Sequence, residues 1–159
     1  MRDEAAMLLS LFTAFHGRIS RKQWWIGFPI VALISVAGEI YLNPGILAEE
    51  GAPPVWAETL WNAFWLIPIT AIMVKRFNDR DRPWWFGWAV SAAMLAADCA
   101  PHFGVLIDPE APLPNAIAFW LVLALLLASI IDNGFLRGTA GPNRYGDDPL
   151  ASKAVPAAA

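Results

Sequence analysis

Charged side chains that can bind one another or an anion are concentrated in one short segment. It runs from Lys75 to Trp85, reads KRFNDRDRPWW, and places four cations and two carboxylates within eight residues. An arginine can hold a carboxylate through two parallel hydrogen bonds, most strongly where water is partly excluded. Apolar runs flank the segment, which predicts a tight hairpin between two membrane-spanning helices. We expect either a network that locks helix ends together or a basic surface for a partner.

Two further segments carry the same kinds of side chain. One, at residues 15–25, reads FHGRISRKQWW, and the other, at residues 143–149, reads NRYGDDP. Turn-forming residues dominate the whole stretch from Gly138 to Pro149 that contains the second segment, so we expect a looped cap on the membrane surface there. Asp132 lies near the end of the last apolar run, where a carboxylate needs a cationic partner to stay ionised. We expect that partner to be Arg76 or Arg18.

Polar side chains also lie inside the apolar runs. Glu39, Glu58 and Asp98 fall in the outer halves of their runs, with no cation near them in the sequence. Asn62 follows Glu58 at i+4 spacing, so the two share one helical face, which should point away from lipid. Three carboxylates at similar depth could bind a cation or relay protons. If they are neutral or reach water they need no function, and both interpretations stay open.

Side chains that ligate metals gather near the end of the third apolar run. They are Asp98, Cys99, His102, Asp108 and Glu110. Pro101 interrupts the helix among them, so the spacing does not fix a common face. The chain also lacks G-x-S-x-G, H-E-x-x-H and a phosphate-binding glycine loop. We therefore expect no enzyme activity, no cofactor and no metal site.

The composition indicates how these side chains are positioned. The chain has 159 residues, of which 57% are hydrophobic and 16% charged, against roughly 45–50% and 25% in soluble domains. Its mean hydropathy is +0.46, and it contains nine tryptophans, a residue that favours membrane interfaces. These values predict a single-domain integral membrane protein.

Four apolar runs can form membrane-spanning helices. We place these spans at about residues 24–42, 56–74, 84–100 and 116–136. Ser20 and Gln23 fit a capping box, with Ile19 and Trp24 at the positions of a hydrophobic staple, so the first helix should begin at Ser20.

These elements define one domain. Residues 1–149 form an all-α, integral membrane four-helix transmembrane bundle with an N-terminal interfacial helix within residues 1–15. An ordinary frayed terminus is the alternative for that first segment. Residues 150–159 should be a disordered tail.

Charge predicts the orientation. With four spans, all eleven cations and seven of the acids fall on one side, giving that side a net charge of +4 and the other −7. By the positive-inside rule, both termini are then cytosolic. We expect a multi-pass membrane protein, in contact with the bilayer and with no nucleic-acid partner.

The three polar segments, taken in order, resemble the bacterial inner-membrane family catalogued as domain of unknown function 805. The likeness covers roughly residues 12–149. The positions that match the family's motifs are Gly17, Arg18, Arg21, Trp25, Arg76, Asp79, Asn143, Tyr145, Gly146, Asp148 and Pro149. Three positions depart from the pattern, because Trp24 replaces Phe or Tyr, Asn78 stands where His is usual, and Pro83 stands near the usual Ser. The resemblance implies location and fold but no activity, and Asn78 cannot serve as an acid or base.

These observations favour a non-enzymatic accessory or scaffold protein. Its cytosolic contact face would consist of the eleven motif residues, and would meet anionic headgroups, a protein partner or a second copy of the chain. The alternative is a small oligomeric ion or solute transporter that uses the intramembrane polar residues. Those are Glu39, Glu58, Asn62, Asp98 and Asp132. An intramembrane enzyme acting on lipid-linked substrates is a further alternative, but no residue of the sequence supports it.

Overall fold

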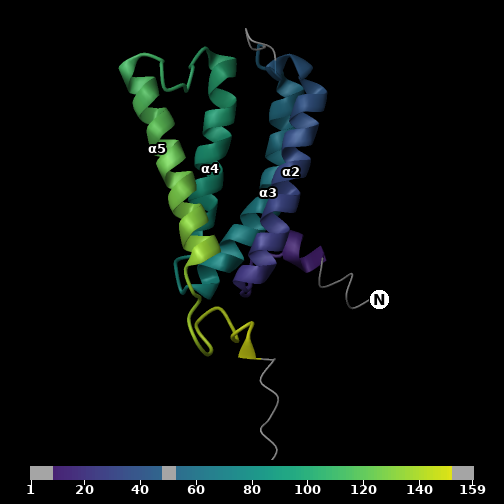
Figure 1. Ribbon diagram of the computed structural model, residues 1–159, viewed down its shortest axis with the longest axis vertical. Coiled ribbons are helices and arrows are strands. Elements are labelled where there is room, and N and C mark those ends of the chain that lie inside the picture. Colours follow the sequence, from purple (N-terminus) through teal and green to yellow (C-terminus); the bar gives the residue numbers. More distant parts are fainter. Residues whose placement is uncertain (1–8, 48–52, 152–159) are drawn as a thin grey trace, which may run out of the picture.

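In the part of the chain that the structure describes, four long helices lie side by side (Figure 1). A computed structural model describes residues 9–47 and 53–151. The long helices are α2 (Arg21–Leu42), α3 (Trp56–Asp79), α4 (Trp85–Cys99) and α5 (Leu113–Ile130). Short helices η1 (Pro44–Leu47), η2 (Ala100–Phe103) and η3 (Ile131–Phe135) follow α2, α4 and α5. Within these described residues there is no strand, only one isolated bridge between Asn143 and Gly146.

The helices alternate in direction and form two pairs that diverge (Figure 1). The α2 and α3 pair lies apart from the α4 and α5 pair at one end, and the pairs meet at the other. The C-terminal segment and the helical residues 9–13 both lie at the end where the pairs meet. The polar segments are therefore positioned at the closed end of the bundle.

The start of α2 follows the predicted capping box. Ser20 Oγ accepts from the amide of Gln23 at 3.3 Å, and the Ser20 amide donates to Gln23 Oε1 at 2.9 Å. Ile19 and Trp24, the staple residues, are 4% and 1% exposed and belong to the hydrophobic core. The prediction of this helix start is confirmed, and it fixes the chain entering the closed end.

Helix α3 continues beyond the predicted hairpin boundary. We expected the span to end near Val74, but the helix runs through Asp79, and every residue from Ile69 to Asp79 is buried. The charged residues of this last turn find partners inside the protein, so they remain helical rather than turning out into water. The chain then turns over Arg80–Trp84 into α4.

Small residues bring α3 and α4 together. A Cβ atom at Gly87 would lie 2.6 Å from Val74 Cγ2 and 3.0 Å from the Val74 backbone nitrogen. Thr70 and Ser91 share a buried hydrogen bond of 2.5 Å between their hydroxyl oxygens. Close approach through glycine and hydroxyl pairing is typical of helix contacts in membranes.

Within residues 9–47 and 53–151, three helices are long and apolar enough to cross a membrane. They are α2, α3 and the continuous Leu113–Phe135 helix formed by α5 and η3. Helix α4 has 15 residues, or roughly 22 Å at 1.5 Å per residue, short of a hydrocarbon core of about 30 Å. Only 6% of the most apolar window of Leu113–Phe135 is buried, so its side chains need an apolar environment outside the protein.

The two ends of the described chain are tied to the bundle. Lys75 Nζ donates to the main-chain oxygens of Ser10 and Leu11, both at 2.6 Å, and so caps the short N-terminal helix. Leu150 and Ala151, expected to begin the disordered tail, form a turn in which the Leu150 amide donates to Asp148. Residues 1–8 and 152–159 lie outside the described residues, so most of the predicted tail does too.

Candidate functional site

The three polar segments meet at the closed end of the bundle. We use the name polar cap for residues 15–25, 75–85 and 132–150. Arg18 connects them, because Nε lies 3.0 Å from Asp79 Oδ1 while Nη1 and Nη2 donate to three carbonyl oxygens of the C-terminal segment. These acceptors are Thr139 at 2.6 Å, Gly141 at 2.7 Å and Gly146 at 3.1 Å. The Arg18 side chain is 1% exposed, so its charge is used inside the protein.

Asp79 is held by two arginines. Its carboxylate pairs with Arg18 through one oxygen and with Arg76 through the other. The Asp79 side chain is 5% exposed. The backbone of Gly138 lies directly against this carboxylate, and a Cβ atom at that position would collide with it. Glycine at 138 is therefore required for the C-terminal segment to close over the ion pair.

Arg76 joins α3 to the end of α5. It is fully buried, and its Nε and Nη2 donate to the carbonyl oxygens of Asn133 at 2.6 Å and Leu136 at 2.5 Å. The helix is π-type at η3, where the Leu136 amide donates back to Ile131 at 3.3 Å. Irregular helix turns leave carbonyl groups without helical donors. Arg76 supplies the donors that these carbonyls need.

Asn78 and Asn143 complete the connection between the segments. Asn78 Nδ2 donates to the carbonyl of Gly17 at 3.1 Å. The main-chain carbonyl of Asn78 accepts from Asn143 Nδ2 at 2.9 Å. Asn143 Nδ2 also donates to Thr139 Oγ1 at 2.9 Å, and the Thr139 amide donates to the carbonyl of Asp79 at 2.8 Å. The asparagine at 78 thus positions backbone rather than transferring protons.

Tyr145 and Arg144 attach the C-terminal segment to the α3–α4 turn. Tyr145 Oη donates to the carbonyl of Arg82 at 2.8 Å. Arg144 Nε pairs with Asp81 Oδ1 at 2.9 Å, with both side chains about half exposed, at 55% and 47%. These outer contacts are exposed to solvent, so each contributes less to the stability of the fold than the buried contacts beneath them.

Asp148 closes the loop that contains Gly141. Its Oδ1 accepts from the Leu150 amide at 2.9 Å and its Oδ2 from the Gly141 amide at 3.1 Å. These two backbone hydrogen bonds, with a smaller contribution from the charge of Arg18, hold the pKa of the Asp148 carboxyl below its ordinary value of 3.8. The carboxylate form is the one that orders the loop.

The remaining motif residues bind the end of α5. Arg21 Nη1 donates to the carbonyl of Phe135 at 3.1 Å, and Trp25 Nε1 donates to the carbonyl of Gly134 at 2.9 Å. Both side chains belong to residues that stay exposed. Helix α2 therefore holds η3, which continues α5, through indole and guanidinium donors.

The predicted partner of Asp132 is wrong. Asp132 pairs with Arg80 at 2.9 Å and more distantly with Arg82 at 3.8 Å, not with Arg76 or Arg18. Arg76 and Arg18 instead bind Asp79 and main-chain carbonyl groups. Asp132 is the second residue of η3, and its carboxylate faces Arg80 and Arg82 in the turn between α3 and α4.

A polar cavity of about 260 Å³ opens at the polar cap. Its lining includes Arg21, Arg137, Asp148 and Pro149, above the buried pair of Arg76 and Asp79. Exposed cations surround it and the neighbouring surface. They are Arg21, Lys22, Arg82, Arg137 and Arg144. The buried charges of the cap are thus held by partners inside the protein, and the exposed surface around them is basic.

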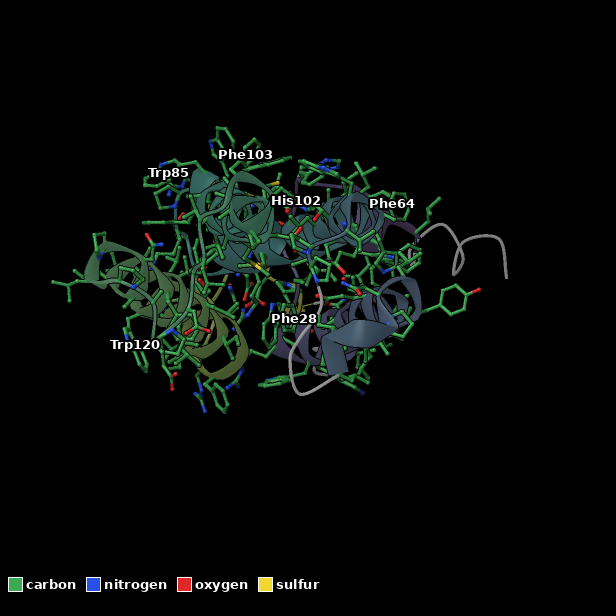
Figure 2. All side chains as sticks on the ribbon, turned by 90° about the horizontal axis from the view of Figure 1, so that it is seen from above. Phe28, Phe64, Trp85, His102, Phe103 and Trp120 are labelled. Carbon is green, nitrogen blue, oxygen red and sulfur yellow. The ribbon has the colours of Figure 1, made fainter. Side chains whose placement is uncertain are left out.

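Three of the five polar residues predicted to lie in the membrane are found away from the polar cap, between the diverging helix pairs. Glu39, Asn62 and Asp98 line a cavity of about 420 Å³ whose walls are mostly apolar. Asn62 Nδ2 donates to Asp98 Oδ1 at 3.1 Å, and Asn62 Oδ1 accepts from Ser35 at 3.1 Å. Seen from the open end, Phe28 lies among the helices whereas Trp85, Phe103 and Trp120 lie on the outside (Figure 2). Asp132 is not part of this cavity.

Glu58 and His102 are used in local structure at the open end. Glu58 Oε1 accepts weakly from the Val55 amide at 3.4 Å, at the start of α3. His102 Nε2 lies 2.8 Å from Thr59 Oγ1, and its ring stacks on Trp56 with centroids 3.8 Å apart. Among residues 9–47 and 53–151, no three His, Cys, Asp or Glu side chains converge to hold a metal ion.

Sequence reasoning missed three residues of the polar cap. The sequence predicts only a loop at Gly138 and Thr139, and no motif includes Asn133, which is fully buried. Asn133 lies in the run Asp132-Asn133-Gly134, a polar interruption at the end of an apolar helix. That interruption is the one signal from which a distorted helix end could have been inferred.

Apolar helices with unburied faces, closed at one end by a polar cap, define an all-helical membrane protein. The family profile described as "Protein of unknown function (DUF805)" matches residues 12–147, and the chain belongs to that family. The chain is 30% identical to "Uncharacterized protein YiiR" of Escherichia coli strain K12 over 142 residues, 85% of each chain. It is 25% identical to "Inner membrane protein YhaI" of the same strain over 143 residues, 89% of this chain and 91% of the relative. No solved structure is significantly similar.

Proposed function

We propose that the chain crosses a bacterial inner membrane four times, with both termini in the cytosol. The alternating direction of α2 to α5 supports this, because the polar cap then carries the described ends of the chain (Figure 1). The basic exterior of the cap fits the cytosolic side by the positive-inside rule. Helix α4 crosses with help from η2, and residues 9–13 lie along the inner interface, held by Lys75.

On this topology, the protein is a non-enzymatic accessory or scaffold protein whose cytosolic cap binds another protein. The observation that carries the proposal is that the cap has two kinds of charge, which are paired charges in its interior and exposed cations on its surface. The motif charges Arg18, Arg76 and Asp79 are buried and paired, which makes the cap rigid. The exposed cations Arg21 and Arg137 lie at the rim of the polar cavity. A rigid surface with unburied cations suits an acidic partner surface.

The same geometry argues against a catalytic role for the two motif carboxylates of the cap, Asp79 and Asp148. A general base needs an oxygen within reach of a substrate and a pKa near the working pH. Asp79 has both carboxylate oxygens engaged by arginines, and Asp148 has both engaged by backbone amides. Neither carboxylate is left to accept a proton from a substrate.

Site-specific crosslinking in native membranes tests the scaffold proposal. A photoreactive amino acid replaces Ala140, which is exposed at the polar cavity, or Leu106, which is 58% exposed at the other end. We expect a discrete adduct from position 140 that disappears when Arg21→Glu and Arg137→Glu are combined, and none from position 106. An adduct of two copies would identify self-association as the contact. Absence of any adduct at 140 rejects the proposal.

The central cavity supports a second candidate, an oligomeric ion or solute transporter. Glu39 and Asp98 line it without a lysine or arginine in the lining, so a cation or proton would compensate their charge. Purified protein in liposomes tests this. Flux of a cation or of protons that is lost in the E39Q and D98N double variant, but kept in the exposed-loop variant Glu110→Gln, would favour transport over the scaffold role.

A further inference from the structure

A separate groove lies where α3, α4 and α5 meet near the polar cap. Its volume is about 290 Å³, and its apolar wall consists of Phe77, Phe86, Val90, Leu125 and Ala128. Phe77 and Val90 are nearly inaccessible, at 6% and 3% exposed, so they form the floor. Ser129 also lines the groove, but its hydroxyl donates to the carbonyl of Leu125 at 2.7 Å. The groove therefore offers an apolar surface without free polar groups along its length.

Two residues of opposite charge form the mouth of this groove. Arg82 and Asp132 line it at the end of the polar cap. Asp132 makes its short contact with Arg80, at 2.9 Å, and Arg82 remains 3.8 Å away with 52% of its side chain exposed. Two arginines facing one carboxylate leave one net positive charge. The Arg82 guanidinium keeps most of its donors available for an anion.

We propose that this groove binds a membrane phospholipid with an anionic headgroup. One acyl chain lies along Phe86, Val90 and Leu125, and the phosphate binds Arg82. The mouth of the groove lies at a suitable depth in the membrane for a headgroup. Trp84 and Trp85, at the start of α4, follow Arg82 closely in the chain and are 57% and 51% exposed. Exposed tryptophans favour the level of the headgroups. Guanidinium and phosphate match in geometry, and a basic group at the inner interface attracts anionic lipid. This lipid site does not depend on the protein contact at the cap.

Lipid retention by purified protein tests the site. The protein is placed in phosphatidylcholine nanodiscs doped with phosphatidylglycerol, and bound lipid is counted by native mass spectrometry after release. Arg82→Gln should lower retained phosphatidylglycerol about fivefold, the factor that corresponds to roughly 1 kcal/mol for one basic residue. Arg144→Gln is the matched control, because Arg144 is equally exposed, at 55%, and lies outside the groove. It should leave retention unchanged.

A second pair of variants tests the acyl chain. Ala128→Phe fills the groove and should abolish retention of phosphatidylglycerol, whereas Ala92→Phe, at an exposed alanine of α4 outside the groove, should not. Equal retention of phosphatidylcholine and phosphatidylglycerol by the unaltered protein, or full retention by A128F, would overturn the proposal. Arg82→Gln leaves packing intact, since the Arg82 carbonyl that binds Tyr145 is kept. Equal retention in R82Q and R144Q therefore also overturns it.

Discussion

Arg18 and Asp79 lie 61 residues apart in the sequence, yet Arg18 Nε donates to Asp79 Oδ1 at 3.0 Å with both side chains almost fully buried. Arg76 occupies the other oxygen of the same carboxylate. Two positive charges beside one negative charge would be unfavourable in a buried site. The carbonyl oxygens that both arginines also bind offset this, because they direct further negative dipoles at the guanidinium groups. The pair therefore depends on the backbone of the C-terminal segment.

Replacing Arg18 tests this dependence. Arg18→Lys keeps the charge, but one ammonium with three donors cannot serve Asp79 and three carbonyls in their planar arrangement. We expect both Arg18→Lys and Arg18→Met to lower the free energy of unfolding by about 3 kcal/mol, the scale for disrupting a buried ion pair. Denaturant titration in detergent micelles measures it. Arg144→Met, at an exposed pair, should cost under about 1 kcal/mol. Equal losses for the two sites would contradict the assignment.

Charge reversal tests the partner of Asp132. Arg80→Glu and Asp132→Arg should each lower the free energy of unfolding, because each leaves a mostly buried charge facing a like charge. Together they should restore about 1 kcal/mol, within the range of coupling between contacting residues. The combination of Arg76→Glu with Asp132→Arg should restore nothing, because Arg76 binds carbonyls of Asn133 and Leu136 instead. Rescue by the second combination would show that the partners are Arg76 and Asp132.

Local sequence rules predicted the parts of the fold that depend on neighbouring residues. The Ser20 and Gln23 capping box needs only helix geometry over one turn, and it forms as expected. Apolar length likewise predicted the helices α2, α3 and α5. The resemblance pointed to the segments that hold Arg18, Asp79 and Asn143, and the structure brings these residues together.

Those local rules could not predict which side chains from different helices form pairs. Which arginine meets Asp132 depends on the rotation of the last helical turn, and the π-turn at Ile131–Phe135 changes that rotation by inserting an extra residue. The extension of α3 through Asp79 was missed for a similar reason. A run of charges normally indicates solvent, and only carbonyl partners distant in sequence allow Arg76 to be buried.

Gly138 provides a steric test of the polar cap. A methyl group there would collide with the Asp79 carboxylate, so Gly138→Ala must displace the C-terminal segment or break an arginine contact. We expect a loss of about 2 kcal/mol or more in the free energy of unfolding, in the range of overpacking in a tight core. Gly104→Ala is a control in open space, where only its positive φ of 73° opposes a side chain. A larger effect at Gly104 than at Gly138 would contradict the closed cap.

The loop closed by Asp148 predicts a dependence on acid. Its pKa is lowered by the amides of Leu150 and Gly141 from an ordinary value of 3.8. A carboxyl whose folded pKa is lowered stabilises the fold fully above its unfolded pKa, and this contribution is lost as the pH falls through the folded pKa. Amide chemical shifts of Gly141 and Leu150 should therefore titrate with a midpoint below 3.8.

The unfolding free energies of the unaltered protein and of Asp148→Asn should differ at neutral pH and converge as the pH falls below about 4. Asp147→Asn is the matched control, because it removes the same charge from an exposed neighbour. Asp147→Asn should leave the free energy of unfolding at neutral pH unchanged. A midpoint above the ordinary value, or a pH-independent difference for D148N, would mean that the Asp148 carboxylate does not order the loop. The loop carries the Gly141 carbonyl that Arg18 binds, so acid should loosen the contact between the C-terminal segment and Arg18 first.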